Sequence, residues 1–436
     1  MEDAETVPLI DDYAGRFDPE ADLSAFSRAA LAILGREYLL NGHLQDRVGL
    51  PLVARRFGGD AYVQFAIEEW MAASPIYSRR MQRALGFEGH DVETVFKNLQ
   101  LDIGAPHQFM DFQFRLERAD YGEFWLPHCG ALLDVEPFGE DRVKLMCHDI
   151  EDPTFDATAA ATHPRMKMRA IHRPPRVPSD RVPHCRWSVF IDDEAVPYEQ
   201  HANLAIVGAS KLANVPIRLP GTDGEPGGVS DYSGRFDPSF QLEDLSHRAL
   251  LVANQEFAVQ SHLLARAFML SVSQRLGEEA ATELGCAQWT GIAALTAERL
   301  LRALKIEGDG IESVAKIFQV HPCFHPRSYS DFSVEIVGGQ RARLTLRDSP
   351  ALAEDDGLSW FAGLGESRHP ALDAVAGAVN PRARCRPLPR PAAGGFAWEV
   401  EIDPRSEPQP VPQELKLAKI SRGATFEFEQ RRSSRA

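Results

Sequence analysis

In the N-terminal part of the chain, the hydrophobic positions first recur with the period of a helix and then with the period of a strand. Apolar residues lie three and four positions apart over 24–46 and 60–86, which predicts two long helices. A shorter helix is expected to begin at Asp91. From Asp111 the sequence DFQFRLER alternates between polar and apolar residues, as in a half-buried strand. Helices followed by antiparallel strands predict an α+β unit.

The same pattern returns later in the chain. Helical spacing recurs over 243–275 and 278–305, and strand alternation recurs from Phe332. The motif DYAGRF at 12–17 returns 219 residues later as DYSGRF at 231–236. At this offset the following residues match: Glu37 with Glu256, His43 with His262, Arg47 with Arg266 and Trp70 with Trp289. We therefore predict a tandem duplication of roughly 190 residues, with two homologous α+β units packed as a pseudo-dimer.

The expected boundaries follow from the repeat and from composition. The first unit covers 10–200, a linker 201–230, the second unit 231–405, and a Pro-rich, basic tail 406–436. Inside the first unit a further strand is expected at about 143–147. Pro153 and Pro370 are expected in the first turns of corresponding helices.

Composition narrows the class of protein. The 436 residues carry a net charge of −16, which argues against nucleic acid or an anionic membrane as a partner. The N-terminal sequence lacks the apolar region of a secretory signal, and six cysteines in such a chain are expected as thiols or ligands. We expect a cytoplasmic protein that acts on a small molecule, and a homodimer is compatible with this expectation.

The segment from Phe124 to Ile191 concentrates the reactive side chains. It contains three adjacent pairs of histidine and cysteine, with two further histidines between the second and third pairs. These residues are His128-Cys129, Cys147-His148, His184-Cys185, His163 and His172. Thiolate and imidazole groups bind zinc, iron or copper. The sequence therefore predicts a transition-metal site in the first unit.

Comparison of the two copies separates scaffold from chemistry. His128-Cys129 aligns with Asp348-Ser349, and Cys185 aligns with Phe396, so the reactive groups occur in the first copy only. His43 has a counterpart in the second copy and is interpreted as structural. Trp70, Trp187 and their counterparts are expected in the core.

Neighbouring residues on a strand face opposite sides, so one member of each His–Cys pair is expected to face the site. We predict Cys129, Cys147, His172 and Cys185 as ligands of one metal ion, with zinc preferred and iron second. An iron–sulfur cluster on the cysteines is a further alternative, as is a site that uses the histidines instead.

The remaining polar groups are predicted to carry out catalysis and to bind substrate. His148, Glu151, His128 and His184 are the expected acid–base groups, and Glu151 is favoured because Arg368 replaces it in the second copy. Helix capping is the alternative role for the acidic run at 149–152. The basic residues Arg165, Arg169 and Arg173 would suit a substrate carboxylate.

Several of these features resemble the L-2-amino-thiazoline-4-carboxylic acid hydrolase-like family. They are the helical lead-in, the RALGFEG turn at 83–89, the cysteines at 129 and 147, and the closing Cys-x-Trp strand from Cys185. Both copies resemble this unit. The resemblance implies cysteines as functional residues and hydrolysis of a C–N bond in a small cyclic amino acid.

Three functions remain open at this point. The first is a metal-dependent hydrolase that uses a metal-activated water in the first unit. The second is an iron-dependent or iron–sulfur oxidoreductase or lyase at the same ligands. The third is a ligand-binding or sensor protein with a structural metal ion.

Overall fold

The computed structural model describes residues 9–218, here called the first half, and 223–429, the second half. The helices of the first half are α1 (Arg28–Leu44), α2 (Asp46–Phe57), α3 (Gly59–Ala84), α4 (Val92–Leu99), α5 (Gly130–Val135), α6 (Glu140–Lys144), α7 (Glu151–Ala160) and α8 (Ala202–Gly208). Those of the second half are α9 (His247–Leu276), α10 (Glu278–Ala303), α11 (Ile311–Val320), α12 (Pro370–Val379) and α13 (Gln413–Ala418). None of the described helices is long and apolar enough to cross a membrane.

Each half contains one four-stranded antiparallel sheet, which confirms the α+β class. The first sheet has the order β1-β2-β4-β3, and the second has the equivalent order β5-β6-β8-β7. The strands of the first are β1 (Gln113–Arg118), β2 (Tyr121–Leu126), β3 (Met166–His172) and β4 (Cys185–Ile191). Those of the second are β5 (Phe332–Gly338), β6 (Arg341–Leu346), β7 (Ala383–Pro387) and β8 (Phe396–Ile402).

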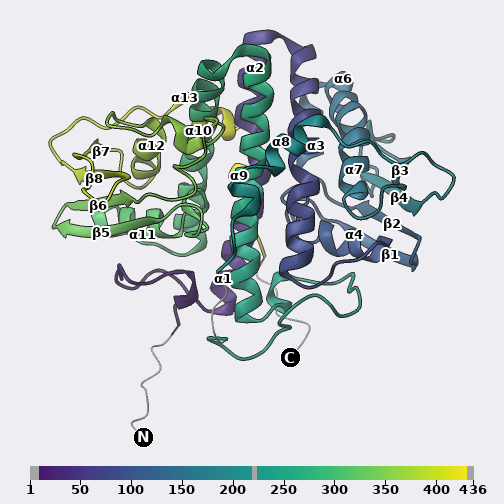
Figure 1. Ribbon diagram of the computed structural model, residues 1–436, viewed down its shortest axis with the longest axis horizontal. Coiled ribbons are helices and arrows are strands. Elements are labelled where there is room, and N and C mark those ends of the chain that lie inside the picture. Colours follow the sequence, from purple (N-terminus) through teal and green to yellow (C-terminus); the bar gives the residue numbers. More distant parts are fainter. Residues whose placement is uncertain (1–8, 219–222, 430–436) are drawn as a thin grey trace, which may run out of the picture.

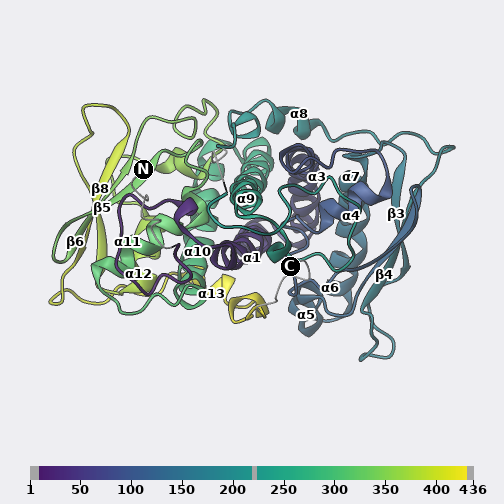
Figure 2. The same ribbon diagram turned by 90° about the horizontal axis from the view of Figure 1, so that it is seen from below.

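The long helices lie in the middle of the molecule and the two sheets lie at its outer ends (Figures 1 and 2). Helix α9 packs on α1 and α3 of the first half, so the central layer is shared by both halves. Equivalent serines begin α1 and α9, where the hydroxyl groups of Ser27 and Ser246 accept hydrogen bonds from backbone N–H groups. Asp91 caps α4 in the same way, as expected from the sequence.

The helix that runs unbroken as α9 is divided into α1 and α2 in the first half. Pro51 lies inside α2, whereas Leu270 stands 219 residues later in α9. Proline lacks the backbone N–H and crowds the preceding turn, which favours an interruption of the helix close to this position. The interruption places Asp46 at the first turn of α2.

Buried ion pairs between the halves occur in equivalent positions. Arg80 of α3 binds Glu256 of α9, and Arg299 of α10 binds Glu37 of α1; the shortest N–O distances are 2.8 and 2.7 Å. Arg299 lies 219 positions after Arg80, and Glu256 lies 219 positions after Glu37. The two contacts therefore repeat each other with the roles of the halves exchanged.

The segments before α1 and α9 are exchanged in the same manner. The backbone N–H of Tyr13 donates to Leu304, and that of Tyr232 donates to Leu85, both at 2.8 Å. The hydroxyl of Tyr13 binds Gln319, and that of Tyr232 binds Gln100. Each half therefore places its own N-terminal segment on the other half.

One local expectation differs from the structure, and two other expected segments contain short helices. The segment at 143–147 is helical, because α6 continues through a π-helical turn (Leu145–Ile150) into α7. The expected linker 201–230 contains α8, which packs on α3. The expected tail contains α13, which packs on α10, while residues 430–436 lie outside the described part of the chain.

Candidate functional site

The three cysteines of the first half meet at one small cavity, here called the thiol cavity. Cys129 caps the start of α5, Cys147 lies in the π-helical turn, and Cys185 is the first residue of β4. All three line a cavity of about 10 Å³, together with Glu151 and His184. A space of this size accommodates about one water molecule. The predicted convergence of the cysteines is thus observed, although Cys147 arrives from a helix and not from a strand.

The environment of these thiols favours their protonated form. Burial raises the pKa of Cys129 to about 12 and raises those of Cys147 and Cys185 well above the usual value. The Cys129 sulfur accepts a hydrogen bond from the backbone N–H of Leu132 at 3.4 Å. The cysteines therefore pack as small apolar groups in this arrangement.

The expected metal ligands do not form a coordination group in the structure. Within residues 9–218 and 223–429, no three or more His, Cys, Asp or Glu side chains are arranged to hold a metal ion. His172 ends β3 and is not among the residues that line the thiol cavity. The residues as placed therefore do not fit zinc, iron or an iron–sulfur cluster.

The histidines expected in catalysis are dispersed. His148 Nε2 lies 2.6 Å from the carbonyl oxygen of Pro174. The ring of His128 lies 6.2 Å from those of His184 and Phe426, centroid to centroid. Of these histidines, His184 lines the thiol cavity, and burial lowers its pKa to about 4. His184 is therefore neutral at physiological pH.

The arginines expected to bind a substrate carboxylate are engaged elsewhere or lie apart. Arg169 forms an ion pair with Asp156 at 2.8 Å, and Arg173 pairs with Asp152. Arg165 is half-buried near the start of β3. None of the three lines the thiol cavity or the larger pocket beside it.

That larger pocket, here called the acid pocket, lies between α2, α3, α7 and the turn after α4. Its volume is about 120 Å³. Carboxyl groups of Asp46, Asp102 and Glu151 line it, and Glu151 also lines the thiol cavity. Aromatic side chains form much of the remaining wall: Tyr62, Trp70, Tyr77, Phe112 and Phe155. The pocket therefore combines apolar walls with several ionisable groups.

The acid pocket perturbs its carboxyl groups by different amounts. Burial raises the pKa of Glu151 to about 8, although the nearby Arg173 opposes the shift. Burial raises the pKa of Asp102 to about 6, opposed by hydrogen bonds from the Gly104 N–H and the Tyr77 hydroxyl. At neutral pH these shifts favour a protonated Glu151 and an ionised Asp102. One acid and one base are thus present in the same pocket.

A second carboxyl pair lies at the start of α2. The indole N–H of Trp70 donates to Asp46 Oδ2 at 3.0 Å, while Asp46 Oδ1 has no hydrogen-bond partner. Glu69 is fully buried beside Asp46, and burial raises the pKa of both groups. Because both side chains offer only acceptors when ionised, a proton held by Glu69 would convert their contact into a hydrogen bond.

The second half does not retain these ionisable groups. The residues 219 positions after Asp46, Tyr62, Glu69, Tyr77 and Asp102 are Ala265, Ala281, Gln288, Thr296 and His321. Beside Trp289, the counterpart of Trp70, the ring of Trp360 stacks at 6.1 Å and its N–H donates to Gln288. In the second half Trp360 therefore packs beside Trp289, whereas in the first half the counterpart Trp70 lines the acid pocket.

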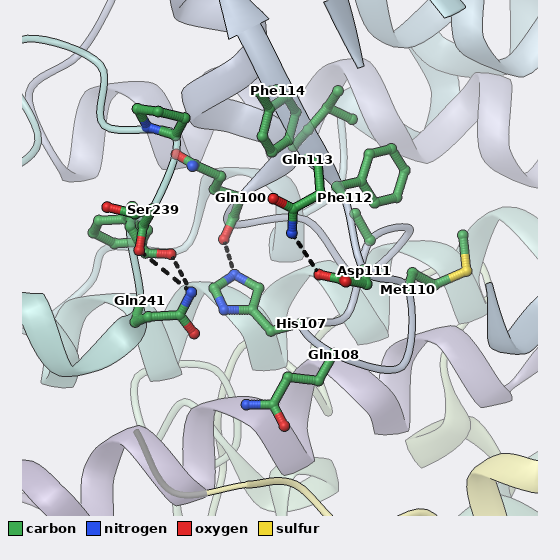
Figure 3. Close-up of a pocket in the computed structure, with 14 residues that line it drawn as sticks. Gln100, His107, Gln108, Met110, Asp111, Phe112, Gln113, Phe114, Ser239 and Gln241 are labelled. Carbon is green, nitrogen blue, oxygen red and sulfur yellow. Dashed lines mark hydrogen bonds between the residues drawn. The ribbon is translucent and has the colours of Figure 1, made fainter. Parts of the chain in front are cut away.

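A surface cleft lies next to the acid pocket. It has a volume of about 400 Å³ and shares Leu99, Met110 and Phe112 with the acid pocket. In Figure 3, Ser239 and Gln241 of the second half lie across the cleft from Gln100 and His107 of the first. The cleft is therefore formed jointly by the two halves, a consequence of the exchanged N-terminal segments.

Comparisons with family models, with curated proteins and with solved structures found no match to this chain. The resemblance to the hydrolase-like family stays a prediction.

The sequence singles out Glu151 but not the other buried carboxyl groups in and beside the acid pocket. Asp46, Glu69 and Asp102 are spread over helices and loops, so their convergence required the fold. The second copy lacks these carboxyl groups, as it lacks the paired cysteines, so the comparison of the two copies could have identified them. His43, interpreted as structural, and Trp70, expected in the core, both line the acid pocket.

Proposed function

We propose that the first half carries an acid–base active site in the acid pocket and hydrolyses a C–N bond in a small polar molecule. The observation that carries this proposal is the placement of Glu151 and Asp102 in one pocket, where burial raises the pKa of the first to about 8 and that of the second to about 6. Carboxyl groups whose pKa values are separated by their surroundings are typical of acid–base pairs. The replacement of the carboxyl groups in the second half supports a functional role over a structural one.

The two carboxyl groups divide the reaction between them. Asp102, held by Tyr77 and the Gly104 N–H, would accept a proton from the water that attacks the carbon atom. Glu151 would donate its proton to the leaving nitrogen as the C–N bond breaks. Exchange with solvent then restores both groups. The apolar walls of the pocket limit competing water and keep Glu151 protonated.

The resemblance to the hydrolase-like family supports the reaction class and suggests the first substrates to test. A panel of small cyclic amino acids, including 2-amino-thiazoline-4-carboxylate, would be followed by NMR for ring opening. Glu151→Gln and Asp102→Asn should each lower kcat by about 10²–10⁴. The control is Glu335→Gln, which removes one charge from an exposed position on β5. Turnover that survives both pocket variants would refute these roles.

A ligand-binding module is the second candidate, favoured by the aromatic walls of the acid pocket. One measurement distinguishes the two candidates, because a ligand-binding module would bind a compound of the panel without converting it. Binding that is lost in Glu151→Gln, with no turnover by the native protein, would favour this alternative.

We also propose that the two halves form a pseudo-dimer derived from a duplicated unit. The ion pairs of Arg80 and Arg299, and the exchanged contacts of Tyr13 and Tyr232, support this arrangement. Contacts that repeat with the halves interchanged are the property of an isologous interface.

A further inference from the structure

The aromatic wall of the acid pocket is unusual beside so many carboxyl groups. Trp70, Tyr77, Phe112 and Phe155 line the pocket, and Tyr62 completes the group. The faces of aromatic rings carry negative potential and attract organic cations. An aromatic wall alone would equally suit a neutral apolar ligand, so the charges in the pocket decide between the two.

The negative charge of the pocket comes from Asp46 and Asp102, because burial favours the protonated forms of Glu151 and of Glu69 beside Asp46. No hydrogen-bond donor of the described residues reaches Asp46 Oδ1, unless Glu69 supplies a proton. A buried carboxylate oxygen without a donor is costly, and a ligand N–H group would satisfy it.

The positive side chains nearby already have partners. Arg47 lines the pocket, but its guanidinium group pairs with Asp134 at 3.0 Å. Arg142 lies over the ring of Tyr62 at 3.8 Å. The charge of Arg47 also attracts Asp46, but neither cation hydrogen-bonds to Asp46 Oδ1, which stays available to a ligand N–H group.

We propose that the acid pocket binds a small organic cation with N–H donors, whose charged group contacts Asp46 and whose apolar part packs on the aromatic rings. The proposal rests on the same site as the proposed hydrolase and names the class of its substrate, an alkylammonium compound. A volume of about 120 Å³ limits this group to a few heavy atoms, since a cavity of ~150 Å³ holds benzene.

Calorimetric titration of the whole protein with cyclopentylammonium and with cyclopentanol tests the charge directly. The two probes have nearly the same size and shape, but only the first carries a charge and three N–H donors. We expect the native protein to bind the ammonium compound at least tenfold more tightly. Asp46→Asn, which keeps the shape of the side chain, should remove most of this preference.

Two further variants test the neighbour of Asp46 and control for the change in net charge. Glu69→Gln introduces the residue of the second half, whose amide N–H can donate to Asp46 Oδ1 and cannot be released as a proton. It should therefore compete with the ligand and weaken ammonium binding while preserving the fold, which circular dichroism would verify. Glu335→Gln lowers the net negative charge by the same amount, far from the pocket, and should leave both affinities unchanged. If Asp46→Asn does not fold, Trp70→Leu takes its place, with the same expected loss.

Equal affinity for both probes overturns the proposal, and so does ammonium binding that Asp46→Asn and Glu69→Gln leave unchanged. Absence of ammonium binding up to tens of millimolar also overturns it. These outcomes are independent of turnover: a protein that binds the cation selectively but hydrolyses nothing would retain this inference and lose the proposed reaction.

Discussion

Replacement of Glu151 by glutamine should change how the stability of the protein depends on pH. Burial raises the pKa of this carboxyl group from 4.5 to about 8 in the folded chain. The unfolded chain releases the proton above its normal pKa, whereas the folded chain keeps it until pH 8 is approached. A rise in pH between these values therefore favours unfolding, and the stability contributed by protonated Glu151 is lost over this window.

The size of the effect follows from the same two pKa values. One pKa unit corresponds to about 1.4 kcal/mol, so Glu151 alone should lower the free energy of unfolding by about 2 kcal/mol between pH 6 and pH 8. Glutamine preserves the shape of the side chain but does not titrate. Over this range we expect the free energy of unfolding of Glu151→Gln to fall by about 2 kcal/mol less than that of the native protein.

Urea denaturation followed by circular dichroism at pH 6, 7 and 8 would measure this difference. Glu69 also titrates abnormally, so the native protein has a steeper pH dependence than Glu151 alone gives, and the comparison of variants isolates Glu151. The exposed Glu335→Gln serves as the control and should follow the native protein. If Glu151→Gln has the native pH dependence, Glu151 is solvated and ionised, and its proposed role as an acid is wrong.

The remaining predictions concern catalysis, the thiols and the interface. For a substrate that is turned over, kcat/KM should rise with pH as Asp102 ionises near pH 6 and fall as Glu151 ionises near pH 8. An alkaline limb of this profile that persists in Asp102→Asn but vanishes in Glu151→Gln would verify the assignment. Because Cys129, Cys147 and Cys185 are buried with raised pKa values, they should react with a thiol reagent only on unfolding; rapid modification of the native protein at all three would contradict this state. Arg80→Ala and Arg299→Ala should each cost about 3–5 kcal/mol in urea denaturation, because each leaves a buried glutamate unpaired, and a large difference between them would argue against equivalent contacts. Elemental analysis of the purified protein is expected to find less than one transition metal per chain; a full equivalent of zinc that is lost in Cys147→Ser would show that the thiols rearrange around a metal ion.

Much of the fold could be predicted from periodicity and from the internal repeat. The helical spacing gave α1, α3, α9 and α10 within a few residues, and the alternation after Asp111 gave β1. The segment around Cys147 could not be assigned in this way. Its run KLMCHDI suits a strand or a helix equally well, and contacts with α3 are available only in the folded chain.

The candidate site was predicted in part, for a physical reason. Local clustering in the sequence identified the cysteines and Glu151, which do converge on the thiol cavity. Asp46 and Asp102 gave no local pattern, because each is one acidic residue at a helix start or in a turn. Whether such a residue is buried beside another depends on helix packing, and its pKa depends on that burial.

The exchange of N-terminal segments has a consequence for how such a chain can diverge. In a symmetric homodimer every substitution appears twice, so a site cannot be abandoned on one side and kept on the other. For the duplicated chain proposed above, covalent fusion removes this constraint. The second half can then pack Trp360 against Trp289 and still supply Ser239 and Gln241 to the cleft of the first. Loss of function in one copy and its retention as a partner are then compatible, because the wall it builds belongs to its neighbour's site.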